Sequence, residues 1–392
     1  MLENVEKDIV CDVVWYCQSS NMKRKVLFLI ESLGGGGAEK VLDTLVHHLD
    51  KDKFDVTVLA ICGGGKYEDS VSSSVHYKYV LKRDERSNAI NKFLYTLKYK
   101  LLYNWLPMWV IYKMIIPKGY DVEVAFVEGF ATKLLAASSC RESKKIAWVH
   151  VDLLQSPWTQ DKGVFSSLQE EINAYKKYDK VVCVSKSVEE VMRAHYRLNN
   201  TTTIFNPLDA AQIRMMGAEP CSFVVDNSKF NVVSVGRLNK QKGYDLLLPI
   251  IERLRRNNNS IHLWLIGEGE EENALREQVE SLALLDCVTF TGFLSNPYSL
   301  MSKMNLFVCS SRAEGFSLVL AESMILGVPV VSMNCSGPNE LIGPNVFGCL
   351  CDSYEELENE IRNVMNGEEI PMGIPPIVDM NNTLEDISVL LG

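Results

Sequence analysis

The chain has 392 residues, a formal net charge of −10 at pH 7 and a sequence pI of about 5.3. Hydrophobic residues make up 47% of it and charged residues 23%, a profile that excludes a largely disordered protein. The length predicts two domains rather than one. The acidic balance argues against a nucleic-acid-binding protein, because such proteins usually present a basic face to phosphate.

The first residues and the cysteines indicate a cytoplasmic protein. The first ten residues are acidic and contain no long apolar run, so they do not resemble a signal peptide. No segment has about 18 uninterrupted apolar residues, the length needed to cross a bilayer. The 11 cysteines lack the spacing of a zinc site or a disulfide framework, and we expect free thiols in a reducing compartment.

The first half of the chain alternates short apolar runs with helical patterns. Met22 opens the first such unit, so we expect residues 1–21 to form a loosely attached N-terminal extension. A strand is predicted over residues 26–30, a glycine-rich turn over 34–37 and an amphipathic helix over 38–49. Further strands are predicted over residues 54–61, 122–126, 145–149 and 180–184. Strands that alternate with helices favour a parallel sheet.

The second half repeats this pattern after a polar, irregular segment over residues 206–228, which we interpret as a hinge. Strands are predicted over residues 231–235, 261–266, 288–291, 306–309 and 328–332, and helices from residue 244 and over 317–326. The sequence therefore predicts an α/β protein of two doubly wound, Rossmann-like domains, residues 22–206 and 207–378, with a tail over 379–392 that includes a short helix. Ligands bind such sheets at the carboxyl ends of the strands, so we expect a shared cleft.

Four glycines, Gly34 to Gly37, lie between the first predicted strand and its helix. Backbone N–H groups at a glycine-rich helix N-terminus can approach an anion closely. The pattern lacks the spacing of a dinucleotide fingerprint and the lysine of a P-loop. A phosphate site and a plain turn are therefore both open for this loop.

Residues 236–245 place two cations, Arg237 and Lys242, just beyond a predicted strand. A guanidinium and an ammonium suit a diphosphate. No acid-rich cluster lies near them in sequence, so they could stabilise a leaving group in place of a metal ion. A solvated basic loop is the alternative.

Residues 310–322 carry two glutamates, Glu314 in a loop and Glu322 within the helix that follows. The helix begins at residues 315–318, where free backbone N–H groups suit a phosphate or a sugar hydroxyl. Glu322 is flanked by apolar residues and should be buried. A buried carboxylate requires hydrogen-bond donors such as ribose hydroxyls, so an ordinary surface acid fits this position poorly.

These motifs, in this order, resemble those of the retaining glycosyltransferases of family 4, which have the GT-B fold of two facing Rossmann-like domains. The motifs are Gly36-Gly37-Ala38-Glu39, Gly236-Arg237 with Lys242-Gly243, and Glu314-Gly315-Phe316 with Glu322, followed by Gly327-Val328-Pro329-Val330-Val331. The match runs in order from Met22 to about Gly348. The glutamate pair with its Gly-x-Pro-Val-Val tail is specific, and the other two motifs are supportive.

The resemblance implies a role for each matching position. Glu322 would bind the nucleotide ribose, and Glu314 would lie by the donor sugar. Further contacts with the diphosphate, the sugar or the base are implied for Arg237, Lys242, Gly36, Gly37, Gly267, Phe293, Gly315, Phe316, Ser317 and Leu318. His150 follows the strand over residues 145–149 and resembles the family's cleft histidine, although a lone histidine is more often structural. The implied catalytic set is Glu314, His150, Arg237 and Lys242.

The family transfers a sugar with retention of its anomeric configuration, and the departing phosphate is thought to help deprotonate the acceptor. The resemblance implies a nucleotide-sugar substrate, expected to be a UDP-sugar, with no separate cofactor and no metal. Domain closure would align acceptor and donor and exclude water. The sequence departs from the family at Ser317, where many relatives have glycine, and in a longer glycine loop.

A basic, aromatic stretch distinguishes the first half. Residues 82–118 carry eight Lys or Arg and two acids, and residues 91–105 mix lysines with Tyr, Phe, Trp and Leu. Trp109, Tyr112, Lys113 and Lys118 follow. Such a segment can lie on an anionic membrane surface, and the family binds acceptors in this half. We expect peripheral contact with the inner face of the plasma membrane and a glycan or polyprenyl-linked acceptor; an amphipathic core helix with solvated lysines is the alternative.

Two other functions remain open. One is a UDP-sugar 2-epimerase on the same two-domain plan, and the glutamate pair argues against it. The other is a non-catalytic sugar-binding relative, and the intact motif residues argue against that. The sequence therefore favours a glycosyltransferase of cell-surface polysaccharide or glycolipid synthesis.

Overall fold

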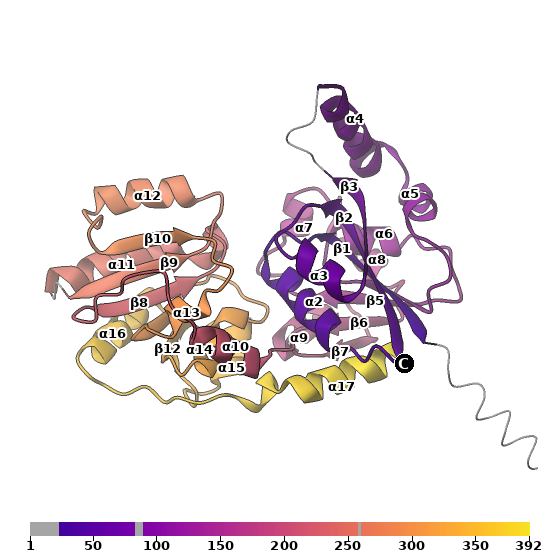
Figure 1. Ribbon diagram of the computed structural model, residues 1–392. Helices are drawn as coiled ribbons and strands as arrows, with labels where there is room; N and C mark the ends of the chain where they lie inside the picture. Colours follow the sequence, from indigo (N-terminus) through magenta and orange to yellow (C-terminus); the bar gives the residue numbers. More distant parts are fainter. Residues whose placement is uncertain (1–22, 83–88, 258–259) are drawn as a thin grey trace, which may run out of the picture.

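The computed structural model describes residues 23–82, 89–257 and 260–392, so the predicted extension over residues 1–21 lies outside the described part. Two parallel sheets flanked by helices make up the two halves of the molecule (Figure 1). The first sheet contains β1 Arg24–Ser32, β2 Phe54–Gly63, β3 His76–Lys82, β4 Val122–Ala125, β5 Lys144–Val149, β6 Lys180–Cys183 and β7 Thr201–Thr203. The second contains β8 Phe230–Val235, β9 Ile261–Ile266, β10 Val288–Gly292, β11 Leu306–Cys309, β12 Val330–Met333 and β13 Cys349–Cys351.

Both sheets have the same doubly wound strand order, which confirms the predicted fold class. The first runs β3-β2-β1-β4-β5-β6-β7 and the second β10-β9-β8-β11-β12-β13. The helices of the first half are α2 Gly37–His48, α3 Glu68–Ser74, α4 Ala89–Lys100, the π-helix η1 Leu101–Trp105, α5 Met108–Ile115, α6 Phe130–Leu135, α7 Trp158–Asp161, α8 Leu168–Tyr175 and α9 Lys186–Ala194. Those that follow are α10 Ala210–Gly217, η2 Lys240–Lys242, α11 Tyr244–Asn257, α12 Glu272–Ser281, α13 Tyr298–Met301, α14 Leu318–Ile325, α15 Ser336–Ile342, α16 Tyr354–Met365, η3 Pro376–Val378 and α17 Met380–Leu391.

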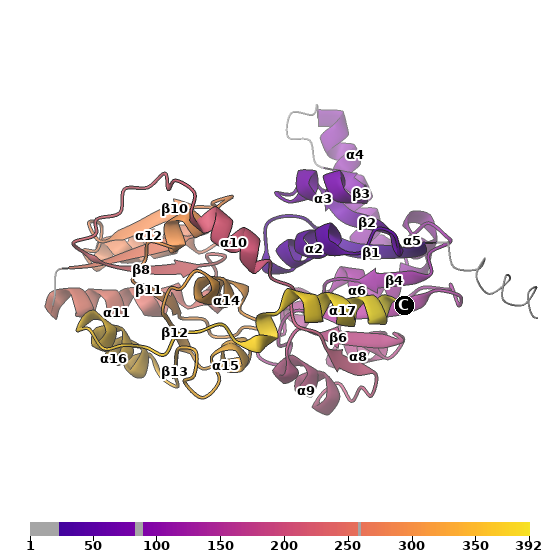
Figure 2. The same cartoon turned by 60° about the horizontal axis from the view of Figure 1, so that its bottom comes forward.

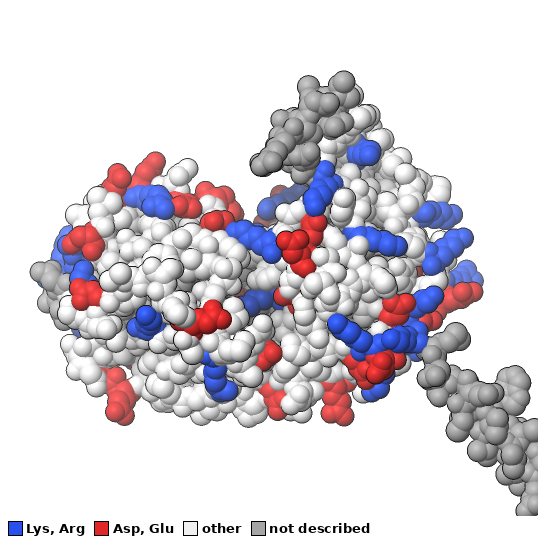
Figure 3. Space-filling view, in the orientation of Figure 1, with Lys and Arg blue, Asp and Glu red and all other residues white. Residues whose placement is uncertain are grey.

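The central strands are buried because helices cover both faces of each sheet. Residues 26–30 of β1 are at most 1% exposed, as the continuous apolar run predicted. One apolar cluster extends from the first domain into the second, with Phe126 and Trp148 on one side and Phe316 and Leu318 on the other. The two domains are therefore packed against each other, and Figure 3 shows a hollow at the rim between them.

The structure differs from the sequence-based expectation in two respects. The hinge predicted over residues 206–228 is not irregular throughout, since it contains α10. Asp209 caps this helix by accepting a hydrogen bond from the Gln212 N–H at 2.8 Å. Three strands, β3, β7 and β13, were missed. Each lies at a sheet edge, and β7 is a run of three threonines, so none presents the apolar run of a buried strand.

The final helix returns to the first domain. Figures 1 and 2 both show α17 lying along the first domain, while the segment before it belongs to the second. The Lys144 ammonium donates to the Leu390 carbonyl at 2.6 Å, and Ile387 and Leu391 are fully buried. The tail predicted over residues 379–392 is thus a packed helix that ties the end of the chain to β5.

Candidate active site

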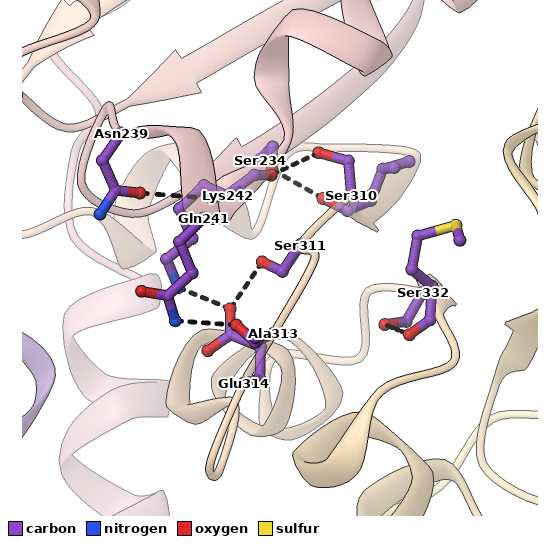
Figure 4. A network of polar contacts seen from close by, with 11 residues as sticks. Ser234, Asn239, Gln241, Lys242, Ser310, Ser311, Ala313, Glu314 and Ser332 are labelled. Atoms are coloured by element: carbon purple, nitrogen blue, oxygen red, sulfur yellow. Dashed lines mark hydrogen bonds and ion pairs between the residues drawn. The ribbon is translucent and has the colours of Figure 1, made fainter. Parts of the chain in front are cut away.

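An ion pair with a buried carboxylate lies just beyond the carboxyl end of β8. Asn239 caps η2 by accepting from the Lys242 N–H at 3.2 Å, and Gly243 then turns the chain in the left-handed conformation at φ +68°. The Lys242 ammonium lies 2.6 Å from Glu314 Oε1, which also accepts from the Ser311 hydroxyl at 2.6 Å (Figure 4). Burial acts against the charge, yet the Glu314 carboxylate raises the pKa of Lys242.

Hydrogen bonds to backbone atoms join the two loops that carry this pair. The Gln241 side-chain amide donates to the Ala313 carbonyl at 2.8 Å (Figure 4). The Arg312 N–H donates to the Gln241 carbonyl at 2.8 Å. The Ser310 hydroxyl donates to the Lys242 carbonyl at 2.8 Å. The second domain therefore holds the lysine and glutamate side chains in one fixed arrangement.

Glu322 lies on α14 and is fully buried, as the sequence predicted. Its Oε1 accepts from the Lys40 ammonium of the first domain at 2.5 Å, and this ammonium also lies 2.5 Å from the Tyr298 hydroxyl. Glu322 Oε2 has no hydrogen-bond partner among the described residues. Burial and the charge of Glu322 raise the pKa of Tyr298, so its hydroxyl stays protonated.

The start of α14 leaves a second polar atom unsatisfied. Ser317 occupies the N-cap position, yet its side chain makes no capping hydrogen bond. It is 1% exposed, and its hydroxyl has no partner within the described part of the chain. Phe316 is buried and lies against Phe205, which follows β7, with ring centroids 6.1 Å apart. The helix start is therefore held in place while retaining unused hydrogen-bonding capacity.

The glycine loop faces this helix from the other domain. A side-chain carbon at Gly37 would lie 3.3 Å from Leu318 Cδ1, which places the start of α2 beside the start of α14. Gly36 is covered instead by the Glu39 carboxylate, which accepts hydrogen bonds from the backbone at the start of α2. Burial raises the pKa of Glu39, and nearby Arg237 partly opposes this shift. Arg237 itself is exposed.

Gly267 and Phe293, which were predicted to lie near the donor, belong to a second contact between the domains. Gly267 has φ +140° and lies against the Gly236 carbonyl, where no side chain would fit. The Phe293 N–H donates to Glu268 Oε1 at 3.2 Å. Lys66 of the first domain lies 2.9 Å from Glu268 Oε2 and 3.5 Å from the Phe293 ring centroid.

His150 lies where the first domain touches the loop of Glu314. Its carbonyl packs against Gly315 so closely that a side chain at this glycine would collide with it. The His150 Nε2 lies 2.9 Å from the Phe126 carbonyl, which can only accept, so Nε2 carries the proton and Nδ1 remains an acceptor. Burial lowers the pKa of His150 to about 4, so the ring is neutral at pH 7.

Glu128 holds the His150 loop in place through hydrogen bonds to its backbone. Its Oε1 accepts from the N–H groups of both His150 and Val151, the latter at 2.9 Å. The side chain is 4% exposed, and burial raises the pKa of Glu128 to about 7. Sequence reasoning missed Glu128, because nothing in the local pattern distinguishes it from an ordinary acid.

The structure thus brings the predicted residues of both domains to one interface. It joins Lys242 to Glu314 and His150 to Gly315, and leaves Arg237 at the exposed rim. Sequence analysis also missed Lys40, Lys66, Tyr298 and Ser311. In the described ranges no group of three or more His, Cys, Asp or Glu is placed to hold a metal ion, and no helix there is long and apolar enough to cross a membrane.

Two doubly wound parallel domains packed against each other have the arrangement of the GT-B class of glycosyltransferases, and buried Glu314 and Glu322 lie in the loops and helix of this site. Residues 221–374 match the family described as glycosyl transferases group 1, and residues 35–212 match glycosyltransferase family 4. The chain is 30% identical over 344 residues to a Campylobacter jejuni N-acetylgalactosaminyltransferase, covering 86% of this chain and 87% of the relative. The protein belongs to the group 1 glycosyltransferases and is a hexosyltransferase-type enzyme.

Other comparisons agree with this assignment. A second C. jejuni α-1,4-N-acetyl-D-galactosaminyltransferase is 24% identical, covering 88% of this chain and 89% of its own length. The crystal structure of Anabaena HepE in complex with UDP-glucose superimposes with a TM-score of 0.70 at 21% identity, covering 94% of this chain and 99% of HepE. This likeness confirms the GT-B fold.

Proposed function

We propose that the protein transfers a sugar from a UDP-sugar, with retention of configuration, to a lipid-linked glycan in cell-surface polysaccharide or glycolipid synthesis. The observation that carries the donor part is Glu322, a fully buried carboxylate whose Oε2 lacks a partner among the described residues. An unpaired buried polar atom costs about 1–3 kcal/mol. A ribose hydroxyl at the domain junction would satisfy it.

The diphosphate and the sugar would lie between Glu322 and the Lys242–Glu314 ion pair. Arg237 is exposed and carries a charge that no ion pair in the described residues neutralises. Together with Lys242 and the start of α14, it would stabilise the departing diphosphate without a metal ion. Glu314, fixed by Lys242 and Ser311, would accept hydrogen bonds from sugar hydroxyls. Neutral His150 would accept another at Nδ1.

The nature of the donor and the acceptor is supported by the relatives. The 30% identical C. jejuni enzyme is named for an acceptor on diphospho-undecaprenol, and the HepE structure contains UDP-glucose. Both features accord with a site that offers a ribose acceptor and diphosphate cations. We therefore favour a UDP-sugar donor and a polyprenyl-diphosphate acceptor over a sugar epimerisation, which needs no acceptor.

A membrane-contact surface would bring the lipid-linked acceptor to the cleft. The segment from α4 to α5 exposes Phe93 (67%), Trp105 (62%) and Trp109 (56%). Exposed lysines accompany them at positions 98, 100 and 113. Figure 1 shows α4 rising from the first domain beside the rim of the interdomain hollow seen in Figure 3. Tyr112 is excluded from this surface, since it is buried and donates to Glu123 at 2.8 Å.

Calorimetry with UDP, GDP and ADP in the presence of EDTA tests the donor. We expect tight binding of UDP alone by the wild type and its loss in Glu322→Ala. Binding of none of them by folded protein would refute the transferase site, and binding that requires added metal would refute the metal-independent mechanism.

Sedimentation with vesicles tests the membrane surface. Vesicles containing anionic lipid should pellet the wild type at low salt, and Trp105→Ser/Trp109→Ser should abolish this. Val224→Ser removes a side chain that is 94% exposed elsewhere and serves as the matched control. Equal pelleting of wild type and double variant would contradict the assignment.

A further inference from the structure

The contact between Lys40 and Glu322 has a consequence for nucleotide recognition that rests on the proposed function. We propose that Lys40 is a positioning residue for the ribose: it holds Glu322 Oε1 from the first domain so that Oε2 faces the nucleotide. The nucleotide site of the second domain is then complete only when the first domain is packed against it.

The position of Lys40 is fixed by the start of α2. Gly36 and Gly37 allow the helix start to approach Leu318, and Glu39 caps it. Lys40 follows in the first turn and points into the second domain, where its side chain is 27% exposed. Its ammonium contacts both Glu322 and the hydroxyl of Tyr298, and it lies 4.8 Å from the Tyr298 ring centroid.

Two partners therefore restrain the ammonium, and the ammonium restrains the carboxylate. Glu322 Oε1 is occupied at 2.5 Å, whereas Oε2 is equally buried and has no partner among the described residues. An ionised carboxylate oxygen can only accept hydrogen bonds, so a buried oxygen without a partner points to a ligand that brings a donor. A ribose hydroxyl has this chemistry, and it can bind without displacing Lys40.

The pair also couples ribose binding to domain closure. If the domains separated, Glu322 would lose the Lys40 ammonium that holds its Oε1 in place. Ribose contact at Oε2 and lysine contact at Oε1 each stabilise the same ionised carboxylate. The two therefore reinforce each other, and closure and nucleotide binding should show positive coupling.

A different role for Lys40 predicts the opposite result. If the ammonium merely occupied the place of the ribose in the absence of nucleotide, removing Lys40 would free the carboxylate and tighten nucleotide binding. The partnerless Oε2 argues against this competition, because the carboxylate already has an oxygen available.

The test is calorimetric binding of UDP, 2′-deoxy-UDP and 3′-deoxy-UDP to wild type, Lys40→Met and Lys40→Arg. The wild type should prefer UDP over at least one deoxy analogue by about tenfold or more, as expected for a hydrogen bond to a charged group. Lys40→Met should weaken UDP binding about tenfold and bring this preference close to one. Lys40→Arg, which keeps the charge, should retain part of it.

Ser187→Ala is the matched control, because it removes another contact between the domains. The Ser187 hydroxyl donates to Glu340 of the second domain at 2.8 Å. This variant should weaken UDP and its deoxy analogues equally and leave the preference unchanged.

The outcomes separate this proposal from the proposed function. UDP binding by Lys40→Met that is as tight as, or tighter than, that of the wild type, or a preserved preference, would overturn the positioning role alone. A wild type that binds UDP and both deoxy analogues equally would overturn the ribose role of Glu322 as well. If Lys40→Met fails to fold, Tyr298→Phe replaces it, and an unchanged preference there, together with one in Lys40→Arg, would overturn the positioning role.

Discussion

The molecule contains two lysine–glutamate pairs with buried carboxylates, and the pairs differ in how they are assembled. Lys242 and Glu314 come from two loops of the same domain, at 2.6 Å, and hydrogen bonds tie these loops together. Lys40 and Glu322 come from different domains, at 2.5 Å, and only the packing of the domains brings them together. One pair exists whenever the second domain is folded, and the other exists only in the closed protein.

This difference separates two tasks of a transferase. Glu314 and Lys242 would act on the sugar and the diphosphate, where the geometry must be ready before the substrate arrives. Lys40 and Glu322 would couple nucleotide binding to domain closure. The following predictions test whether the first pair is a folding element and whether the interdomain contacts are weaker.

The largest effect is expected for the pair within one domain. Glu314→Gln leaves the Lys242 charge buried without its partner and should lower the free energy of unfolding by about 3 kcal/mol. Chemical denaturation measures this loss. The double variant Lys242→Met/Glu314→Gln should recover much of it, and a single variant within 1 kcal/mol of wild type would show that the pair is not structural.

A second effect concerns Glu128 and His150 of the first domain, whose pKa values are shifted in opposite directions. The pKa of Glu128 is raised from 4.5 to about 7, so the folded state keeps a proton that the unfolded state loses, and stability falls as the pH rises through this window. The pKa of His150 is lowered from 6.5 to about 4, so stability rises with pH between 4 and 6.5. Each shift is worth about 3 kcal/mol, so the two nearly cancel.

The variant Glu128→Gln should reveal the pH dependence of stability that is due to His150 alone. The amide oxygen can still accept from the two backbone N–H groups, but it does not titrate. Unfolding free energies measured from pH 4 to 6.5 should then rise by about 3 kcal/mol, whereas the wild type should change little between pH 4.5 and 6.5. A flat profile in the variant would mean that His150 is not neutral in the folded protein.

The smallest effect is expected for the exposed pair between the domains. Lys66 and Glu268 have side chains that are 38% and 57% exposed, so water and salt screen their attraction. Lys66→Met should weaken UDP binding less than about fivefold, and the difference from wild type should shrink in 0.5 M NaCl. A loss as large as that expected for Lys40→Met would remove the distinction between a contact with a buried carboxylate and one with an exposed carboxylate.

The sequence allowed the fold to be predicted because most buried strands are continuous apolar runs. Strands β1, β5 and β9 lie within two residues of their predicted bounds. The edge strand β7 could not be found this way, since its threonines are only half buried on the rim of the sheet. Helix α10 was missed because its composition is short and mixed, and only Ile213 of its residues is buried.

In the candidate site, features within one domain could be predicted from the sequence, whereas the contact between the domains could not. The burial of Glu322 could be predicted, because its apolar neighbours are adjacent in sequence. The contact of Lys40 with Glu322 joins residues 282 positions apart in different domains, and no local pattern specifies it. The roles of the motif residues stay predictions for the binding experiments to test.

The return of α17 to the first domain gives the junction a second crossing of the backbone. The chain passes from the first domain to the second before β8 and comes back before α17, where Ile387 and Leu391 are buried. Two separate tethers allow rotation about a line through both, but they oppose twisting and sliding. A protease cut before α17 would therefore leave both domains on one chain, whereas after a cut before β8 the packing of α17 would still hold the second domain to the first.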